Sequence, residues 1–139
     1  MTIMCKSACA AAVLAVTGRG VATVPATFTA ALVRGVTIDA TGTVTAYTAV
    51  TGGGYAPITV QNDESFWDDD ASIPSALSSA FSWPIIEAGG YVQAPTHAAL
   101  IHPTSGEVWF LIDVPAQPAA EGGTYSVPAE GIEVSITSI

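Results

Sequence analysis

The stretch THAALIHPTSGEVWFLIDV, residues 96–114, predicts a β-hairpin and sets the fold class. Two apolar runs, Thr96–His102 and Glu107–Val114, flank the connection Pro103–Gly106. A proline early and a glycine late in a four-residue connection are typical of a β-turn between antiparallel strands. The hairpin is therefore the starting point for an antiparallel, mainly β fold.

Short strand-like runs continue on both sides of this hairpin. The 13 glycines and nine prolines punctuate the chain every few residues. No long amphipathic helix separates the runs, which argues against a βαβ architecture. We predict a mainly β protein, with an antiparallel β-sandwich or jelly-roll-like domain over residues 21–139. The further strands are expected at Thr27–Arg34, Thr43–Val50, Tyr55–Val60, Thr124–Val127 and Gly131–Ile139, with a weaker one at Ala76–Trp83.

The first twenty residues, MTIMCKSACAAAVLAVTGRG, allow two interpretations. One charge before a short apolar run is the layout of a secretory signal, but Ala15-Val16-Thr17 is a poor cleavage site. Alanine-rich sequence favours a helix, which Ser7 can cap and Gly18 can stop. We predict one short N-terminal helix in a segment, residues 1–20, that stays attached.

The alanines of this segment are candidate contact residues. Because their side chains are small, another backbone can pack closely against such a helix. The expected protein-contact residues are Ala8, Ala11, Ala12 and Ala15.

The composition favours protein partners over nucleic acid or membranes. Only 11% of the residues are charged, against about 25% in an average globular protein, so the surface is largely neutral and easy to desolvate. The net charge is −9, and the basic residues are Lys6, Arg19 and Arg34. Three scattered cations cannot form the basic patch that phosphate binding or an anionic membrane requires. We expect no nucleic-acid and no membrane partner.

Five carboxylates crowd into the run QNDESFWDDD, Gln61–Asp70. Crowded carboxylates can chelate calcium, but their order does not match the EF-hand pattern. We expect a solvent-facing loop, in which Phe66 and Trp67 either anchor the loop to the core, the favoured reading, or contact a partner. The acidic residues of this loop are Asp63, Glu64, Asp68, Asp69 and Asp70.

No catalytic, cofactor or metal site is predicted. Cys5 and Cys9 do not form a disulfide framework, and zinc would need two further ligands. Small buried thiols are the expected reading of this pair. His97 has no accompanying nucleophile motif, and Gly52–Gly54 lacks the lysine of a phosphate loop. We expect a non-enzymatic protein without a cofactor.

The order of several short motifs along nearly the whole chain resembles a known family. Arg19-Gly20 is followed by Pro25-Ala26-Thr27 and by the sequence GGGYA at Gly52–Ala56. Later matches are Ser82-Trp83-Pro84, Thr96-His97, Thr104-Ser105-Gly106, Gly122-Gly123-Thr124 and Gly131–Ile136. In this order the chain resembles small bacteriophage virion proteins often labelled tail-fibre proteins. The resemblance implies a short N-terminal helix, a β-sandwich and no catalytic residues.

The expected function is that of a virion structural protein, and within the virion a capsid decoration (cement) protein. One domain of 139 residues leaves no room for the shaft and tip of a fibre. The expected partners are the major capsid protein or tail components, and further copies of the chain in a homo-oligomer, with a trimer as the favoured state. One alternative is a tail-fibre or receptor-facing structural module. The other is a secreted carbohydrate-binding domain.

Overall fold

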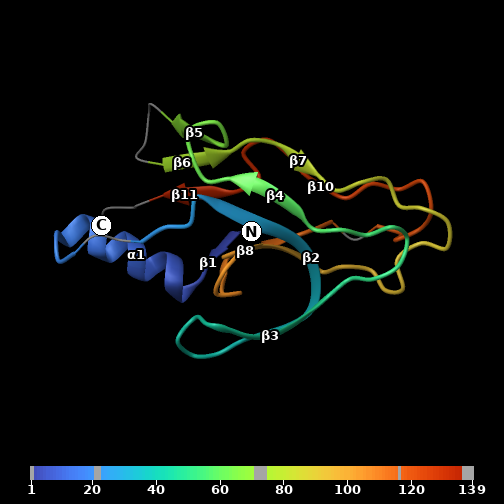
Figure 1. Ribbon diagram of the computed structural model, residues 1–139, viewed down its shortest axis with the longest axis horizontal. Helices are drawn as coiled ribbons and strands as arrows, with labels where there is room; N and C mark the ends of the chain where they lie inside the picture. Colours follow the sequence, from blue (N-terminus) through green and yellow to red (C-terminus); the bar gives the residue numbers. More distant parts are fainter. Residues whose placement is uncertain (1, 21–22, 71–74, 116, 136–139) are drawn as a thin grey trace.

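The computed structural model describes residues 2–20, 23–70, 75–115 and 117–135. Within these residues the protein is mainly β, with one N-terminal helix and antiparallel sheets, which confirms the predicted fold class (Figure 1). The elements are β1 (Thr2–Met4), α1 (Lys6–Thr17), β2 (Thr27–Ile38), β3 (Val44–Ala49), β4 (Ile58–Gln61), β5 (Trp67–Asp70), β6 (Ser75–Ser78), β7 (Phe81–Ser82), β8 (His97–Ile101), β9 (Val108–Asp113), β10 (Ser126–Val127) and β11 (Glu133–Ser135).

The central sheet has the strand order β1-β9-β8-β2-β3, and β4 also pairs with β2. Strands β8 and β9 form the predicted hairpin, in which Ala98 lies opposite Ile112 and the N–H of His102 donates to the carbonyl of Glu107 at 2.8 Å. Gly106 closes the turn with a φ of 74°. The first half of β2 pairs with β4 and the second half with β3, so these two strands share one edge of β2.

A β-bulge in β9 puts two aromatic residues on the same face of the central sheet. Leu100 lies opposite Phe110 and Ile101 lies opposite Val108, so Trp109 is inserted between the two pairs. Both Trp109 and Phe110 therefore belong to the larger core. Their ring centroids lie 5.8 and 5.9 Å from the ring centroid of Phe28.

The larger core lies between this face and a second layer made of loops and two small sheets. The small sheets are β10–β7 and β11–β6–β5. Trp83 is the largest fully buried side chain, and its Nε1–H donates to the carbonyl of Ala30 at 3.1 Å. Other buried members of this core are Phe28, Leu32, Phe66, Ile86, Tyr91, Leu100, Phe110, Ile112, Tyr125 and Ile132.

The opposite face of the central sheet carries a second, smaller core. Its buried members are Cys5, Ala31, Val33, Ala99, Ile101, Val108 and Leu111. Figure 1 shows β2 curving toward β3. The N–H of Lys6 donates to the carbonyl of Gly42 in the β2–β3 turn at 3.1 Å, so the turn reaches the start of α1 from across the sheet.

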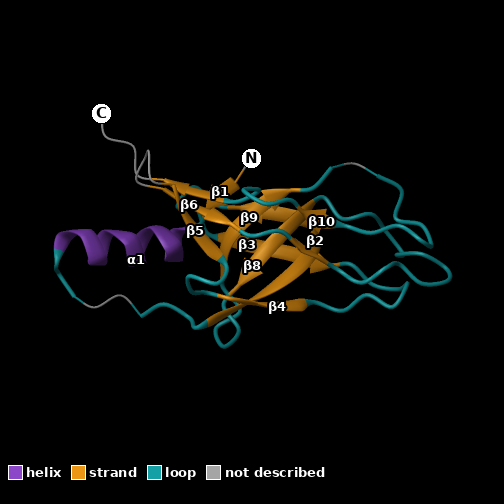
Figure 2. Ribbon diagram, turned by 90° about the horizontal axis from the view of Figure 1, so that it is seen from above, coloured by secondary structure: helices purple, strands orange, loops and turns teal. Residues whose placement is uncertain are grey.

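The N-terminal helix is anchored to the body at its first turns and extends away from it (Figure 2). It lies against β9, and of its twelve residues only Ala8 is buried. Gly18 ends the helix in the left-handed conformation, as predicted. The prediction of Ser7 as the N-cap is wrong: Cys5 occupies that position without a side-chain cap bond, and Ser7 donates to Glu107 Oε2 at 2.8 Å.

Two strands were not expected from the sequence. Strand β1 pairs with β9, Met4 opposite Phe110, so the first residues are part of the central sheet. Strand β5 takes up the second half of the acidic run and pairs with β6. That half is therefore strand rather than the predicted loop.

Candidate interaction surface

An open groove of about 530 Å³ separates α1 from the layer formed by β5, β6 and β11. We call it the α1 groove. It joins the two segments that the sequence marked as separate candidate surfaces, because the alanines of α1 lie on one side and acidic residues lie on the other. The lining residues are Met4, Ala8, Ala11, Ala12, Ala15, Val24, Phe28, Asn62, Asp63, Glu64, Trp67, Asp68, Ala76, Trp109, Phe110 and Val134.

The helical wall of the α1 groove consists of the four predicted contact alanines. Their spacing of three or four residues places them on one face of the helix. Exposure increases along this face: Ala8 is buried, Ala11 and Ala12 are half-buried, and Ala15 is exposed. The groove therefore widens toward the free end of α1.

The acidic wall begins in a tight turn after β4. Asp63 Oδ1 accepts hydrogen bonds from the Ser65 hydroxyl at 2.5 Å and from the Ser65 N–H at 2.8 Å. Both bonds lower the pKa of Asp63, and the bond from the hydroxyl has the larger effect. Asp63 is therefore charged at neutral pH. Glu64 and Asp68 are exposed beside it, whereas the side chains of Asp69 and Asp70 lie outside the described part of the chain.

Asn62 fixes this wall to the start of β2. Its Nδ2 donates to the carbonyl of Pro25 at 2.7 Å, and its Oδ1 accepts from Trp67 Nε1 at 2.8 Å. Phe66 is buried, which confirms the anchor interpretation for that residue. Trp67 is half-buried and lines the groove, so one aromatic residue holds the wall and the other forms its surface.

The floor of the α1 groove is aromatic and contains one unsatisfied donor. Trp109 is 7% exposed, and its buried Nε1–H donates to no acceptor within the described residues. A buried donor without an acceptor costs about 1–3 kcal/mol. The bulge explains why the floor has two large rings, since regular alternation would turn Trp109 to the opposite face.

The outer faces of α1 are also apolar. Val13 and Val16 are 57% and 72% exposed, and Leu14 is 37% exposed. A helix in a globular protein normally has one apolar stripe and an opposite polar face. Because α1 is apolar on all sides and buries only Ala8, most of its apolar surface faces solvent in a single copy of the chain.

Strand β3 provides a second uncharged surface. All six of its residues, VTAYTA, lack charge, and five of them are exposed. Within the described residues β3 pairs with β2 alone, so it lies at an edge of the sheet. Exposed edges in natural proteins usually carry charges or prolines that block further pairing. This edge has neither.

In the described residues, no group of three or more histidine, cysteine, aspartate or glutamate side chains could hold a metal ion. Cys5 and Cys9 are both free thiols; Cys5 is buried and Cys9 is exposed, so the expectation of buried thiols holds only for Cys5. Burial, followed by the charge of Cys9, raises the pKa of Cys5 to about 11.

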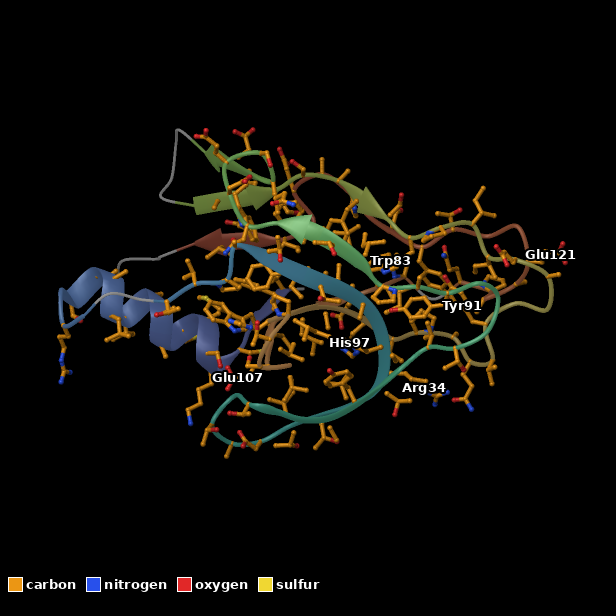
Figure 3. All side chains as sticks on the ribbon, viewed as in Figure 1. Arg34, Trp83, Tyr91, His97, Glu107 and Glu121 are labelled. Atoms are coloured by element: carbon orange, nitrogen blue, oxygen red, sulfur yellow. The ribbon has the colours of Figure 1, made fainter. Side chains whose placement is uncertain are left out.

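His97, which Figure 3 labels, lies opposite Asp113 in the pairing of β8 with β9. His97 Nε2 lies 3.0 Å from Asp113 Oδ1, and its Nδ1 lies 2.8 Å from the hydroxyl of Thr96. The backbone N–H of Thr96 donates to the carbonyl of Val33 at 2.9 Å. These contacts tie β9, β8 and β2 together, which gives His97 a structural explanation.

Comparisons with known proteins add no relative to this description. No protein-family model, no curated protein and no solved structure matches the chain. Within the described residues no helix is both long and apolar enough to cross a membrane. The function is therefore inferred from the α1 groove, the apolar helix and the uncharged edge strand.

Proposed function

We propose that this chain is a non-enzymatic structural protein of a bacteriophage particle, and that it decorates the capsid as a cement protein. The observation that carries the proposal is α1, a helix that is apolar on all sides and buries only Ala8 in its own chain. A helix of this kind is normally buried within a larger structure. An assembly that covers it would remove this apolar surface from water.

The rest of the surface supports a role in assembly. Strand β3 is exposed and uncharged, so a protein partner can cover it without desolvating any charge. Val13 and Val16 add exposed apolar area, and each buried methylene group contributes about 0.8 kcal/mol to association. These surfaces suit broad contact with other proteins rather than recognition of one small ligand.

A decoration protein fits these features better than a fibre. It needs a compact body and a contact surface, both of which are described above. A protein that binds only the assembled shell stabilises the shell by its binding free energy, and many modest contacts act together. The net charge of −9 would keep decorated particles apart in solution.

Copy number in purified particles tests this proposal. Quantitative mass spectrometry of the phage that encodes the chain should find hundreds of copies per particle, in a fixed ratio to the major capsid protein. Particles stripped of the chain should break at a lower temperature, and adding the purified chain should restore their stability. A handful of copies that leave with detached tails would refute decoration and favour the fibre. Absence from particles, together with secretion, would favour the carbohydrate-binding alternative.

A further inference from the structure

We infer that the α1 groove is the docking site for α1 of a second copy of the chain, so that two copies exchange helices about a two-fold axis. This inference concerns self-association, replaces the trimer expected from the sequence with a dimer, and does not depend on the virion proposal. The groove is open and mainly apolar, and its wall of small residues (Ala8, Ala11, Ala12 and Ala15) allows another helix to approach closely. A twelve-residue helix is about 18 Å long, and α1 leaves most of that length unburied in its own copy.

The exchange places both faces of α1 in contact. If the helix of each copy enters the groove of the other, the layers run body, partner helix, own helix, partner body. The alanine face of α1 then packs against the partner's α1. The opposite face, which carries Val13, packs against the partner's body. This arrangement explains why α1 is apolar on both faces, which a one-sided contact would not require.

The charges of the chain favour the same pairing. Residues 1–20 contain two of the three basic residues, Lys6 and Arg19, and none of the twelve acidic residues. The facing wall of the groove carries Asp63, Glu64 and Asp68. An antiparallel pair of helices brings the free end of one α1, next to Arg19, toward the acidic wall of the other copy. A chain with a net charge of −9 thus presents opposite charges at this one contact.

The unsatisfied indole of the groove floor supports an occupied groove. Trp109 lines the groove, and its Nε1–H has no acceptor in the described residues of one copy. The C-terminal carbonyl groups of an α-helix have no partner within that helix, so the end of a docked helix supplies acceptors. A small shift of the ring would then satisfy groups on both sides of the contact.

Sedimentation equilibrium of the full chain across the micromolar range tests the exchange. The expected particle has twice the 14.1 kDa mass of the monomer. Ala12→Glu places a charge on the groove face and should raise the dissociation constant of the dimer more than tenfold. Ala88→Glu, the same change in an exposed turn outside the groove, should leave it unchanged. Circular dichroism checks that both variants are folded.

A charge exchange makes the test independent of any folding defect in Ala12→Glu. Arg19→Glu and Glu64→Arg should each raise the dissociation constant about tenfold, because each replaces an attraction between opposite charges by a repulsion between like charges. A tenfold change corresponds to about 1.4 kcal/mol of binding free energy. The double variant restores opposite charges and should dimerise as the unmodified chain does. A monomer throughout the concentration range, a trimer, or a double variant weaker than both single variants would overturn the inference.

Discussion

Two buried tryptophans allow a direct measurement of what one hydrogen bond contributes to this fold. Trp83 and Trp109 are 2% and 7% exposed, and both belong to the larger core. The Nε1–H of Trp83 donates to the carbonyl of Ala30 at 3.1 Å, whereas that of Trp109 has no acceptor in the described residues. Replacing each by phenylalanine removes the same atoms, but only one replacement breaks a hydrogen bond.

The expected free energies follow from this difference. In both variants the smaller ring leaves a gap, which costs about 1–2 kcal/mol. Trp83→Phe also leaves the carbonyl of Ala30 without this donor, for a further cost of about 1–3 kcal/mol. Trp109→Phe instead removes an unsatisfied buried donor, which returns about the same amount. Trp83→Phe should therefore destabilise the protein by at least about 2 kcal/mol more than Trp109→Phe.

Urea unfolding followed by circular dichroism measures both variants against the unmodified chain. The dependence of the unfolding free energy on urea should stay the same, so that the midpoint alone reports stability. The measurement belongs at a concentration where the unmodified chain is monomeric, because Trp109 also lines the α1 groove. Equal destabilisation by the two replacements, or a larger effect of Trp109→Phe, would refute the reasoning.

Three further predictions concern the thiols, the turns and the glycines. In the native protein maleimide should modify Cys9 and leave Cys5 unmodified, because Cys5 is 1% exposed and its thiol has a pKa of about 11. Intact-mass analysis should find one maleimide adduct on the native protein and two adducts on the protein unfolded in urea. The hydroxyl of Thr41 and the backbone N–H groups of Thr43 and Thr41 donate to Asp39 and lower its pKa below the ordinary value of 3.8. These hydrogen bonds therefore stabilise the folded protein fully above the ordinary pKa, and this stabilisation is lost as the pH falls through the lowered pKa. The urea concentration at the unfolding midpoint should therefore decrease when the pH is lowered below about 4, and this decrease should be smaller in Asp39→Asn. Gly53→Ala should lower the free energy of unfolding more than Gly122→Ala. Both glycines have a positive φ, but only at Gly53 would the new Cβ lie 2.9 Å from a backbone carbon. Thermal unfolding compares the two variants, and equal losses of stability would contradict the steric argument.

The strands that were predicted correctly are those whose evidence is local. The hairpin β8–β9 could be read from two apolar runs and a turn with suitable proline and glycine positions, all within residues 96–114. The end of α1 could be read from Gly18, because a glycine just beyond an apolar run supplies the left-handed stop. In each case neighbouring residues determine the backbone, so a window of the sequence contains the necessary information.

The features that were missed depend on partners far away in the sequence. Strand β1 has three residues and forms through its pairing with β9, over a hundred positions later. Strand β5 lies in an acidic run, a composition that is depleted in strands, and it is held by β6. Ser7 was a reasonable N-cap by residue type, but Glu107 offers its hydroxyl a better acceptor. The α1 groove was missed for the same reason, because its two walls were treated as unrelated surfaces.

The choice of alanine on one face of α1 explains why the groove is open. Leucine at Ala11, Ala12 and Ala15 would add apolar side chain to the helical wall and narrow the groove within one copy. Each such side chain has three more carbon atoms than alanine, so the chain forgoes about 2 kcal/mol of burial at each position. The apolar surface that stays uncovered within one copy can still be buried against another chain. The alanines therefore favour association of two chains. The alanines therefore weaken the packing of the helix against its own body and leave room for a second helix.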